Sequence, residues 1–546
     1  MRRYILSSLT LIIAATLVVD GRQRPGPRFY DDDPLWVEPI TQNVTDVSDY
    51  EPNLIFQSAQ GLLTQSGDPA TGQRAQNINT VDGVPDGPFF VNRAGRTPLT
   101  PALVARASNT SDGPAPPPWT VVSAKSDGVT PGFTIRDSKN DLWFIKFDPP
   151  GYRAMATGTE VVAAKLFWAA GYHTVEYYLR QLSPADLVIG PKAHVTPAGQ
   201  KERPMVQDDV AGLLAKADRD PDGTYRVIVS KAAPGRPVGR IRFDGTRKDD
   251  PNDIVPHEHR RELRAYRVFA AWLNHVDAKG INSIDVLVSE QGKSFIRRYL
   301  LDFGSVLGSA AIGPREPWEG YEGLLESPGD ILGRILTLGL KVPAWRTIDW
   351  YEHPAIGRVE KSYAAWDPQR WAPHIMNGAF WHMRSDDAFW AAEKLAVMTD
   401  DIIAAAVAEG RFGAPEAERE LVRTIRERRD RILQRYLPAL NPVTDLAIAD
   451  GRLTFRNAAT DARVAATPSG YVADWFTFNN ATSERTPLGT TTGAGTTLTA
   501  PGLPATGFIA VDLRAQGGPA SWSQPVTAHF RMVDGGWKLV GFVRQP

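Results

Sequence analysis

The stretch from Arg267 to Gly308 constrains this chain more than any other, because it holds two polar motifs separated by two largely apolar runs. The first motif, residues 275–282, reads HVDAKGIN, and the second, residues 302–304, reads DFG. The runs between them, residues 284–288 and 295–301, are joined by the polar segment SEQGK, which predicts a strand, a turn and a second strand. A hairpin of this kind would bring the two motifs side by side.

The polar residues of these motifs are of the types that phosphoryl transfer requires. Such a site needs a carboxylate near the acceptor hydroxyl, oxygen ligands for Mg²⁺ and a cation for the migrating charge. Asp277 fits the catalytic carboxylate, and Lys279, two residues further on, fits the cation. Asn282 and Asp302 fit the metal ligands.

Together the motifs resemble the catalytic loop and the metal-binding segment of the protein-kinase fold. Val276 stands where ordinary protein kinases have an Arg, and this departure resembles the atypical branch: HipA-type kinases, lipid kinases and secretory-pathway kinases. The resemblance implies an α+β, two-lobed kinase-like domain with an antiparallel β N-lobe and a helical C-lobe. It also implies ATP or another nucleoside triphosphate as cofactor, with Mg²⁺ or Mn²⁺. Coincidence is the alternative, because a DFG triplet alone is a weak signal.

Strand signals upstream fit the same resemblance. Residues 119–125, 133–137 and 142–147 predict a three-stranded meander. The first turn carries Gly128 and Gly132, whose backbone N–H groups are expected to approach nucleotide phosphates. An ordinary hairpin is the alternative at this turn, because it lacks the G-x-G-x-x-G pattern.

Lys146 lies on the third of these strands among apolar neighbours, where an unpaired ammonium would be costly. Kinase-like folds place a Lys there to hold the nucleotide phosphates, paired with a Glu of the next helix. That helix is predicted over residues 157–170 with Gly171 as its C-cap, and Glu160 is the expected partner. A first-turn Glu favoured only by the helix dipole is the competing interpretation of Glu160.

Two further segments have a place in the resemblance. The Pro- and Gly-rich segment 232–239 is expected to join the two lobes and to hold adenine through its backbone. Residues 256–274 carry an apolar stripe at helical spacing, so this segment is predicted as the helix that delivers the catalytic loop.

The N-terminus has the layout of a secretory signal. Arg2 and Arg3 precede the apolar run 4–19, which is short for a membrane span. The segment 1–22 is therefore expected to be a signal peptide or N-terminal anchor, and the protein to be exported to the periplasm, cell envelope or exterior. The only membrane contact expected is a tether through this segment. A buried N-terminal helix is the alternative.

Composition limits the partners. The formal net charge of -1 gives no basic field, so no nucleic acid is expected as a partner. The chain has no cysteine, which excludes disulfides, thiolate catalysis and cysteine-ligated metals. The expected partner is a phospho-acceptor, either a protein or a small molecule.

The sequence predicts four parts. After the signal segment come a Pro- and Gly-rich arm and linker over residues 23–115, the kinase-like domain over 116–440, and a C-terminal β-sandwich over 443–546. The sandwich is predicted from regularly spaced short strands, and it contains no candidate site residue. The sequence therefore predicts that a chain truncated after Asn441 would still fold and bind nucleotide.

The function that these residues favour is a nucleotide- and divalent-metal-dependent phosphotransferase acting on an acceptor hydroxyl. Two alternatives remain open: a pseudokinase that serves as a binding or scaffold protein of the cell envelope, and an adenylyl transferase on the same fold. The intact motifs favour an enzyme over the pseudokinase. The acceptor is left open.

Overall fold

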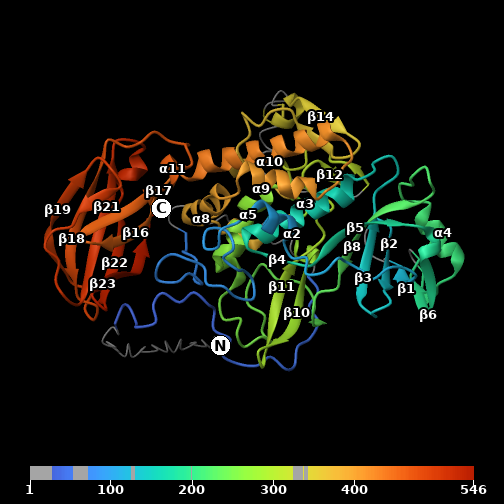
Figure 1. Cartoon of the computed structure of the whole chain (residues 1–546), viewed down its shortest axis with the longest axis horizontal. Helices are drawn as coiled ribbons and strands as arrows, with labels where there is room; N and C mark the ends of the chain where they lie inside the picture. The colour runs from blue at the N-terminus through green and yellow to red at the C-terminus, as the bar shows by residue number, and fades with distance from the viewer. Residues whose placement is uncertain are drawn as a thin grey trace, which may run out of the picture.

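The computed structural model describes residues 27–52, 72–124, 130–197, 200–310, 312–323, 336 and 342–545. It is a mixed α/β protein with a sheet-rich N-terminal part, a helical part and a nearly closed antiparallel sheet at the C-terminus. The two large sheets lie at opposite ends of the molecule, with most of the helices between them (Figure 1). The predicted signal segment 1–22 lies outside the described residues.

The first large sheet has seven strands in the order β5-β8-β3-β2-β1-β6-β7. The predicted meander is confirmed, since β1, β2 and β3 are antiparallel neighbours. The bounds are β1 Trp119–Ala124, β2 Gly132–Arg136, β3 Leu142–Phe147, β5 Tyr177–Leu182, β6 Leu187–Val195, β7 Arg203–Pro204 and β8 Tyr225–Lys231.

Alternation along the strands gives this sheet two different faces. Val227 and Val229 of β8 belong to a core that includes helix α4, Gln207–Leu214, whereas Ile228 between them belongs to the main core with α3. Helix α3, Met155–Ala170, is buried along almost its whole length. The carboxylate of Asp148 accepts hydrogen bonds from two backbone N–H groups at its start, and Gly171 with φ +130° is its C-cap, as predicted.

The predicted strand-turn-strand is confirmed as the hairpin of β10, Ser283–Glu290, and β11, Lys293–Leu300. Its turn residues Gln291 and Gly292 both have positive φ, which suits the right-handed twist of a two-residue hairpin. The hairpin forms the centre of a four-stranded sheet, β4-β11-β10-β9, in which β4 is His173–Thr174 and β9 is Arg236–Pro237. At its open end the N–H of Leu301 donates to the carbonyl of Asn282 over 3.0 Å, so the two motifs do meet.

The Pro- and Gly-rich segment 232–239 connects these two sheets. Its first residue, Ala232, donates from its N–H to the carbonyl of Leu142 in the seven-stranded sheet over 3.0 Å. A few residues later β9 pairs with β10 in the four-stranded sheet. The segment therefore has the bridging position that the sequence predicted.

Helices pack around the hairpin and against α3. Helix α5, Arg261–Trp272, leads into the HVDAKGIN motif and buries nearly all its residues. The chain between Ser385 and Ala408 forms two helices, and the side chain of Thr399 caps the second. The bounds are α2 Pro101–Arg106, α7 Gly378–Trp381, α8 Ser385–Ala396, α9 Asp400–Ala408 and α10 Pro415–Tyr436, with short strands β12 Ser309–Ala310, β13 Gly313–Pro314, β14 Trp350–His353 and β15 Gly357–Glu360.

The prediction of a C-terminal β-sandwich is wrong. The strands form one sheet in the order β19-β18-β21-β22-β23-β16-β17-β20 rather than two packed sheets, and its end strands β19 and β20 contact each other. Alternating residues predict strands but not which strands pair across the sheet, so the sequence could not separate the two architectures. The bounds are β16 Val443–Ala449, β17 Arg452–Asn457, β18 Gly470–Phe478, β19 Arg485–Gly493, β20 Thr497–Thr499, β21 Phe508–Gln516, β22 Val526–Val533 and β23 Gly536–Val543, with the one-turn helix α11, Ala458–Asp461.

The described part of the N-terminal arm packs on two different sheets. Phe29 lies against Phe478 and His529 of the C-terminal sheet, with ring centroids 6.0 and 5.1 Å away. Val44 and Val47 pack on Ile296 of the hairpin. One continuous core runs from α3 through α5 and α8–α10 into the C-terminal sheet. Among the described helices, none is long and apolar enough to cross a membrane.

Candidate functional site

Three charged side chains from separate segments meet beside α3. The ammonium of Lys146, on β3, donates to Glu160 Oε1 and to Asp302 Oδ1, each over 2.8 Å. Glu160 lies on α3, and Asp302 follows the hairpin. The side chain of Glu160 is 3% exposed and that of Asp302 is 46% exposed, so the cluster runs from the core to solvent.

The two carboxylates keep Lys146 charged. Burial alone would lower the pKa of this ammonium, but Asp302 and Glu160 together raise it well above its ordinary value. The ion pair between Lys146 and Glu160 that the sequence predicted is therefore present. Their role toward a nucleotide stays a prediction.

Asp302 is held in a strained backbone conformation with φ +58°. The next residue, Phe303, is fully buried and stacks on Phe167 of α3 with ring centroids 5.1 Å apart. The DFG motif is thereby fixed to the helix that carries Glu160. This packing explains how one short motif places its carboxylate beside Lys146.

Asp277 is surrounded by donors. Asn282 Nδ2 donates to its Oδ2 over 2.7 Å, and Lys279 Nζ forms an ion pair with its Oδ1. His374 Nδ1 lies 3.4 Å from the same Oδ1. Burial alone would raise the pKa of Asp277, but these three partners, His374 first, hold it well below its usual range. Asp277 is therefore an ionised carboxylate, as a proton acceptor must be.

His374 and Glu319 are site residues that the sequence reasoning missed. His374 Nε2 lies 2.6 Å from Glu319 Oε1, and the backbone N–H of His374 donates to the carbonyl of Val276 over 2.8 Å. Burial works against the charged imidazole, but hydrogen bonds to Asp277 and Glu319 raise the pKa of His374. Neither residue belongs to a motif or a periodic segment, so no sequence signal pointed to them.

His275, the first residue of the HVDAKGIN motif, has a packing role. It is fully buried, and its ring lies 5.7 Å from that of Phe303 and 5.8 Å from that of Phe167. Burial lowers the pKa of His275 to about 4, so it is neutral at pH 7. Its ring packs among aromatic side chains, Phe303 and Phe167 among them.

The predicted metal ligands, Asn282 and Asp302, suit a hard cation whose other ligands are water and phosphate oxygens. Asn282 uses its amide nitrogen for Asp277, so its amide oxygen is the atom it offers to a metal. Asp302 adds a half-exposed carboxylate. No group of three or more His, Cys, Asp or Glu able to hold a metal occurs in the described part of the chain. One carboxylate and one amide fit Mg²⁺, which proteins bind through few ligands together with substrate phosphates.

Only one of the two glycines that were predicted to approach nucleotide phosphates lies within the described residues. Gly132 is the first residue of β2 and lies opposite Lys146 in the β2–β3 register, so it is next to the charged cluster. Gly128 lies outside the described residues. The role of this turn stays a prediction.

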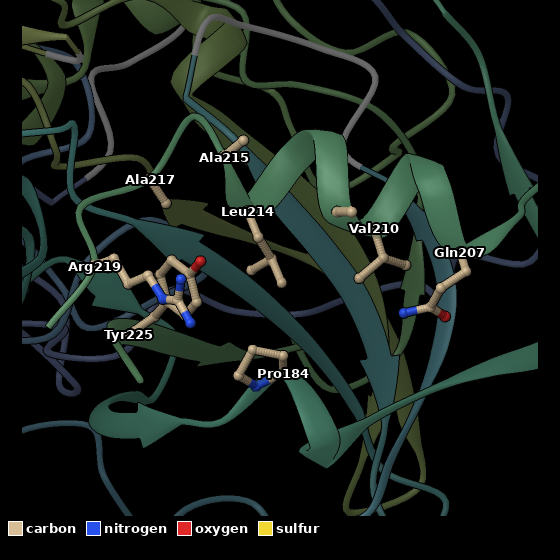
Figure 2. Close-up of a pocket in the computed structure, with 9 residues that line it drawn as sticks. Pro184, Gln207, Val210, Leu214, Ala215, Ala217, Arg219 and Tyr225 are labelled. Atoms are coloured by element: carbon tan, nitrogen blue, oxygen red, sulfur yellow. The ribbon is translucent and has the colours of Figure 1, made fainter. Parts of the chain in front are cut away.

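A hollow of about 410 Å³ lies elsewhere, beneath α4. Figure 2 shows Val210 and Leu214 of α4 pointing into it and the guanidinium of Arg219 beside the ring of Tyr225. Tyr225 shares the α4 face of the seven-stranded sheet with Val227 and Val229. Lys146 pairs with Ile228 and contacts α3, so its side chain lies on the opposite face. The hollow is not part of the charged cluster.

Comparisons with known proteins add little to this geometry. No protein-family model matches the chain, and no curated protein matches it. Among solved structures, the Helicobacter pylori proinflammatory kinase CtkA is similar at 11% identity over 55% of this chain and 92% of that one, with a TM-score of 0.26. A likeness this weak cannot locate a site, so the functional argument depends on the residues themselves.

Proposed function

We propose that this chain is a kinase-like phosphotransferase that uses ATP or another nucleoside triphosphate, with Mg²⁺ or Mn²⁺, to phosphorylate an acceptor hydroxyl. The observation that carries the proposal is the contact of Lys146 with both Glu160 and Asp302. These residues come from a strand, a helix and the DFG motif, and phosphotransferases of the kinase type use this combination.

Lys146 would hold nucleotide phosphates. Its ammonium stays charged, and Asp302, the more exposed of its two partners, is the one that phosphates and a metal would draw away. The side chain of Glu160 is buried and pairs with Lys146, so Glu160 would fix the position of the Lys146 ammonium. A bound Mg²⁺ would neutralise charge on the phosphates, held by Asp302 and Asn282.

Asp277 would accept the proton of the acceptor hydroxyl. Its low pKa keeps it ionised, and Asn282, Lys279 and His374 fix its orientation. Lys279 is 17% exposed and would lie close to the migrating phosphoryl group. Catalysis would then depend mainly on positioning and electrostatics, as is usual for this reaction.

The acceptor class and the location are further parts of the proposal. A protein or a small molecule with a hydroxyl fits the chemistry of Asp277. The basic and apolar segment 1–22 supports export, with a membrane tether limited to that segment. Adenine would lie against the backbone of residues 232–239, which bridge the two sheets.

Parallel assays with γ- and α-labelled ATP test the proposal. The full-length protein is incubated with each label, Mg²⁺ or Mn²⁺, and a panel of protein, sugar and lipid acceptors. We expect transfer of the γ label. Transfer of the α label would instead indicate an adenylyl transferase, and nucleotide binding without transfer of either label would indicate a binding protein.

The variant Asp277→Asn separates chemistry from binding. It should keep nucleotide affinity and lose roughly 100-fold or more in turnover, the range for loss of a general base. Asp349→Asn is the matched control, because that carboxylate is 74% exposed and pairs only with Lys361 among the described residues. Equal turnover of Asp277→Asn and the control would overturn the assignment of Asp277.

A further inference from the structure

A second pocket lies between α5, α8 and the C-terminal end of α10, with a volume of about 320 Å³. None of its ten lining residues is an Asp or a Glu, and three are arginines: Arg267, Arg384 and Arg435. None of the residues proposed for phosphotransfer lines it. A concave site with this charge is unusual, because buried cations are normally paired.

Arg267 is the strongest feature of this pocket. Within the described ranges its guanidinium donates only to backbone carbonyls, those of Phe380 over 3.4 Å and Gln369 over 3.1 Å. Its Nε is buried without a hydrogen-bond partner, and no carboxylate within the described ranges forms an ion pair with it. Burial lowers the pKa of Arg267, yet a guanidinium stays protonated. Arg267 is a half-buried cation, and it has no counter-charge among the described residues.

The other two arginines add positive charge that their neighbours only partly offset. Arg384 Nε donates to Asp386 Oδ1 over 3.0 Å, but Asp386 also lies 3.1 Å from Arg261 Nη2. Arg435 is 49% exposed, and its Nε is 4.0 Å from Asp367 Oδ1, the outer limit of an ion pair. The mouth of the pocket therefore remains positive.

The lining also offers neutral donors and an apolar wall. Trp381 Nε1 is buried and has no hydrogen-bond partner in the part of the chain that the structure describes. The hydroxyl of Ser385 is a further donor, and Met383, Ala388 and Ala439 supply apolar surface. Polar groups beside an apolar wall are typical of small-ligand sites, and the volume is at the small end of their range.

We propose that this pocket binds a small organic oxyanion, with a phosphate or carboxylate group against Arg267 and Arg435 and a compact apolar body against the wall. The planar fork of a guanidinium matches either group through two parallel hydrogen bonds. An oxyanion would supply the counter-charge that Arg267 lacks and accept the hydrogen of Trp381 Nε1. The site is separate from the one proposed for the nucleotide.

Calorimetric titration of the full-length protein tests this with three probes that share a phenyl ring: phenyl phosphate, benzoate and benzyl alcohol. We expect saturable binding of at least one anion at one site, and much weaker binding of the uncharged alcohol. The tighter anion identifies the group that the natural ligand carries. Absence of saturable binding for both anions, or equally tight binding of the alcohol, would overturn the proposal.

Variants locate the binding in the pocket. Arg435→Gln should raise the Kd of the anion about tenfold, because a hydrogen bond to a charged group contributes a free energy of about that size. Arg435 is half-exposed, so the variant is expected to fold. Arg426→Gln on the same helix is the matched control, because Arg426 is 45% exposed and pairs with Asp400 outside the pocket.

Trp381→Phe keeps the ring and removes the N–H donor, and it should weaken binding as well. Equal affinity in Arg435→Gln and Arg426→Gln would contradict the assignment.

Discussion

Lys146 Nζ lies 2.8 Å from Asp302 Oδ1, although 156 positions separate the two residues in the sequence. Two local structures produce this contact. The antiparallel meander places Lys146 on the α3 face of its sheet, and the stacking of Phe303 on Phe167 fixes the DFG motif against the same helix. The cation and the carboxylate are therefore positioned by packing of apolar neighbours rather than by the loop alone.

Replacement of Lys146 by Met should reduce both stability and nucleotide binding. The change leaves Glu160 buried without its cation, and breaking a pair of this kind costs about 3 kcal/mol. Urea unfolding and nucleotide titration measure the two effects. Adding Glu160→Gln should recover part of the stability, because the uncompensated charge is removed.

Lys231→Met is the control for this experiment. Lys231 lies on the neighbouring strand β8, is 31% exposed and pairs with Asp141 over 3.2 Å. The variant should lower the free energy of unfolding by less than about 1 kcal/mol, because exposed ion pairs contribute little. If Lys146→Met were as stable as Lys231→Met and bound nucleotide equally well, the ion-pair argument would fail.

Nucleotide should stabilise the protein against heat only when a divalent ion is present. At a nucleotide concentration ten times its Kd, the added free energy of unfolding is about 1.4 kcal/mol. Asp302→Asn should lose the increment that depends on the metal, while Asp349→Asn should keep it. A metal-dependent shift that persists in Asp302→Asn would exclude Asp302 as a ligand.

Short-range patterns predicted much of the site. The hairpin between the two motifs followed from two apolar runs with a polar turn, and the C-cap at Gly171 from capping chemistry. The pairing of Lys146 with Glu160 followed from the resemblance to kinases. His374 and Glu319 were not predicted, because they lie in segments without regular periodicity. His374 contacts Asp277, and Glu319 contacts His374. The nearly closed C-terminal sheet was missed for a related reason, since strand pairing is a long-range property.

Acid should destabilise the protein through His275. Its pKa in the folded state is about 4, whereas an exposed His titrates near 6.5, so the unfolded chain binds more protons between these values. The stability that the neutral His275 contributes is therefore fully present above about pH 6.5 and is lost as the pH falls toward 4. Between pH 7 and 5 the loss from this group is about 2 kcal/mol.

Urea unfolding of His275→Leu at pH 7 and pH 5 checks this contribution. Leu has a similar volume and does not titrate, so the variant should lose less stability than the wild type over this interval. The other buried imidazoles, including His173 and His529, titrate in both proteins and cancel in the comparison. Identical pH dependence in the two proteins would contradict the prediction.

Truncation after Asn441 should give an unstable or aggregating protein, contrary to the expectation from the sequence. The Asn441 side chain donates to the carbonyls of Leu513 and Gln524 over 3.0 and 2.8 Å, and Trp522 Nε1 donates to the carbonyl of Pro438 over 3.1 Å. The main core is also continuous across this junction. Removal of the C-terminal sheet would expose apolar surface of the helical part. A monomeric truncated chain that unfolds cooperatively would show that the sheet is dispensable.

His374 should influence turnover through the position of Asp277. Its Nδ1 faces Asp277 and its Nε2 faces Glu319, so the imidazole links one carboxylate to the other. His374→Asn keeps a donor near the place of Nδ1, whereas His374→Gln keeps one near the place of Nε2. If orientation of Asp277 is its role, His374→Gln should lower turnover about tenfold with nucleotide affinity unchanged, and His374→Asn should lower turnover less.

His353→Ala is the control, because that imidazole is 26% exposed and pairs with Glu416. Equal losses in His374→Asn and His374→Gln, together with lower thermal stability in both, would show that His374 supports only the fold.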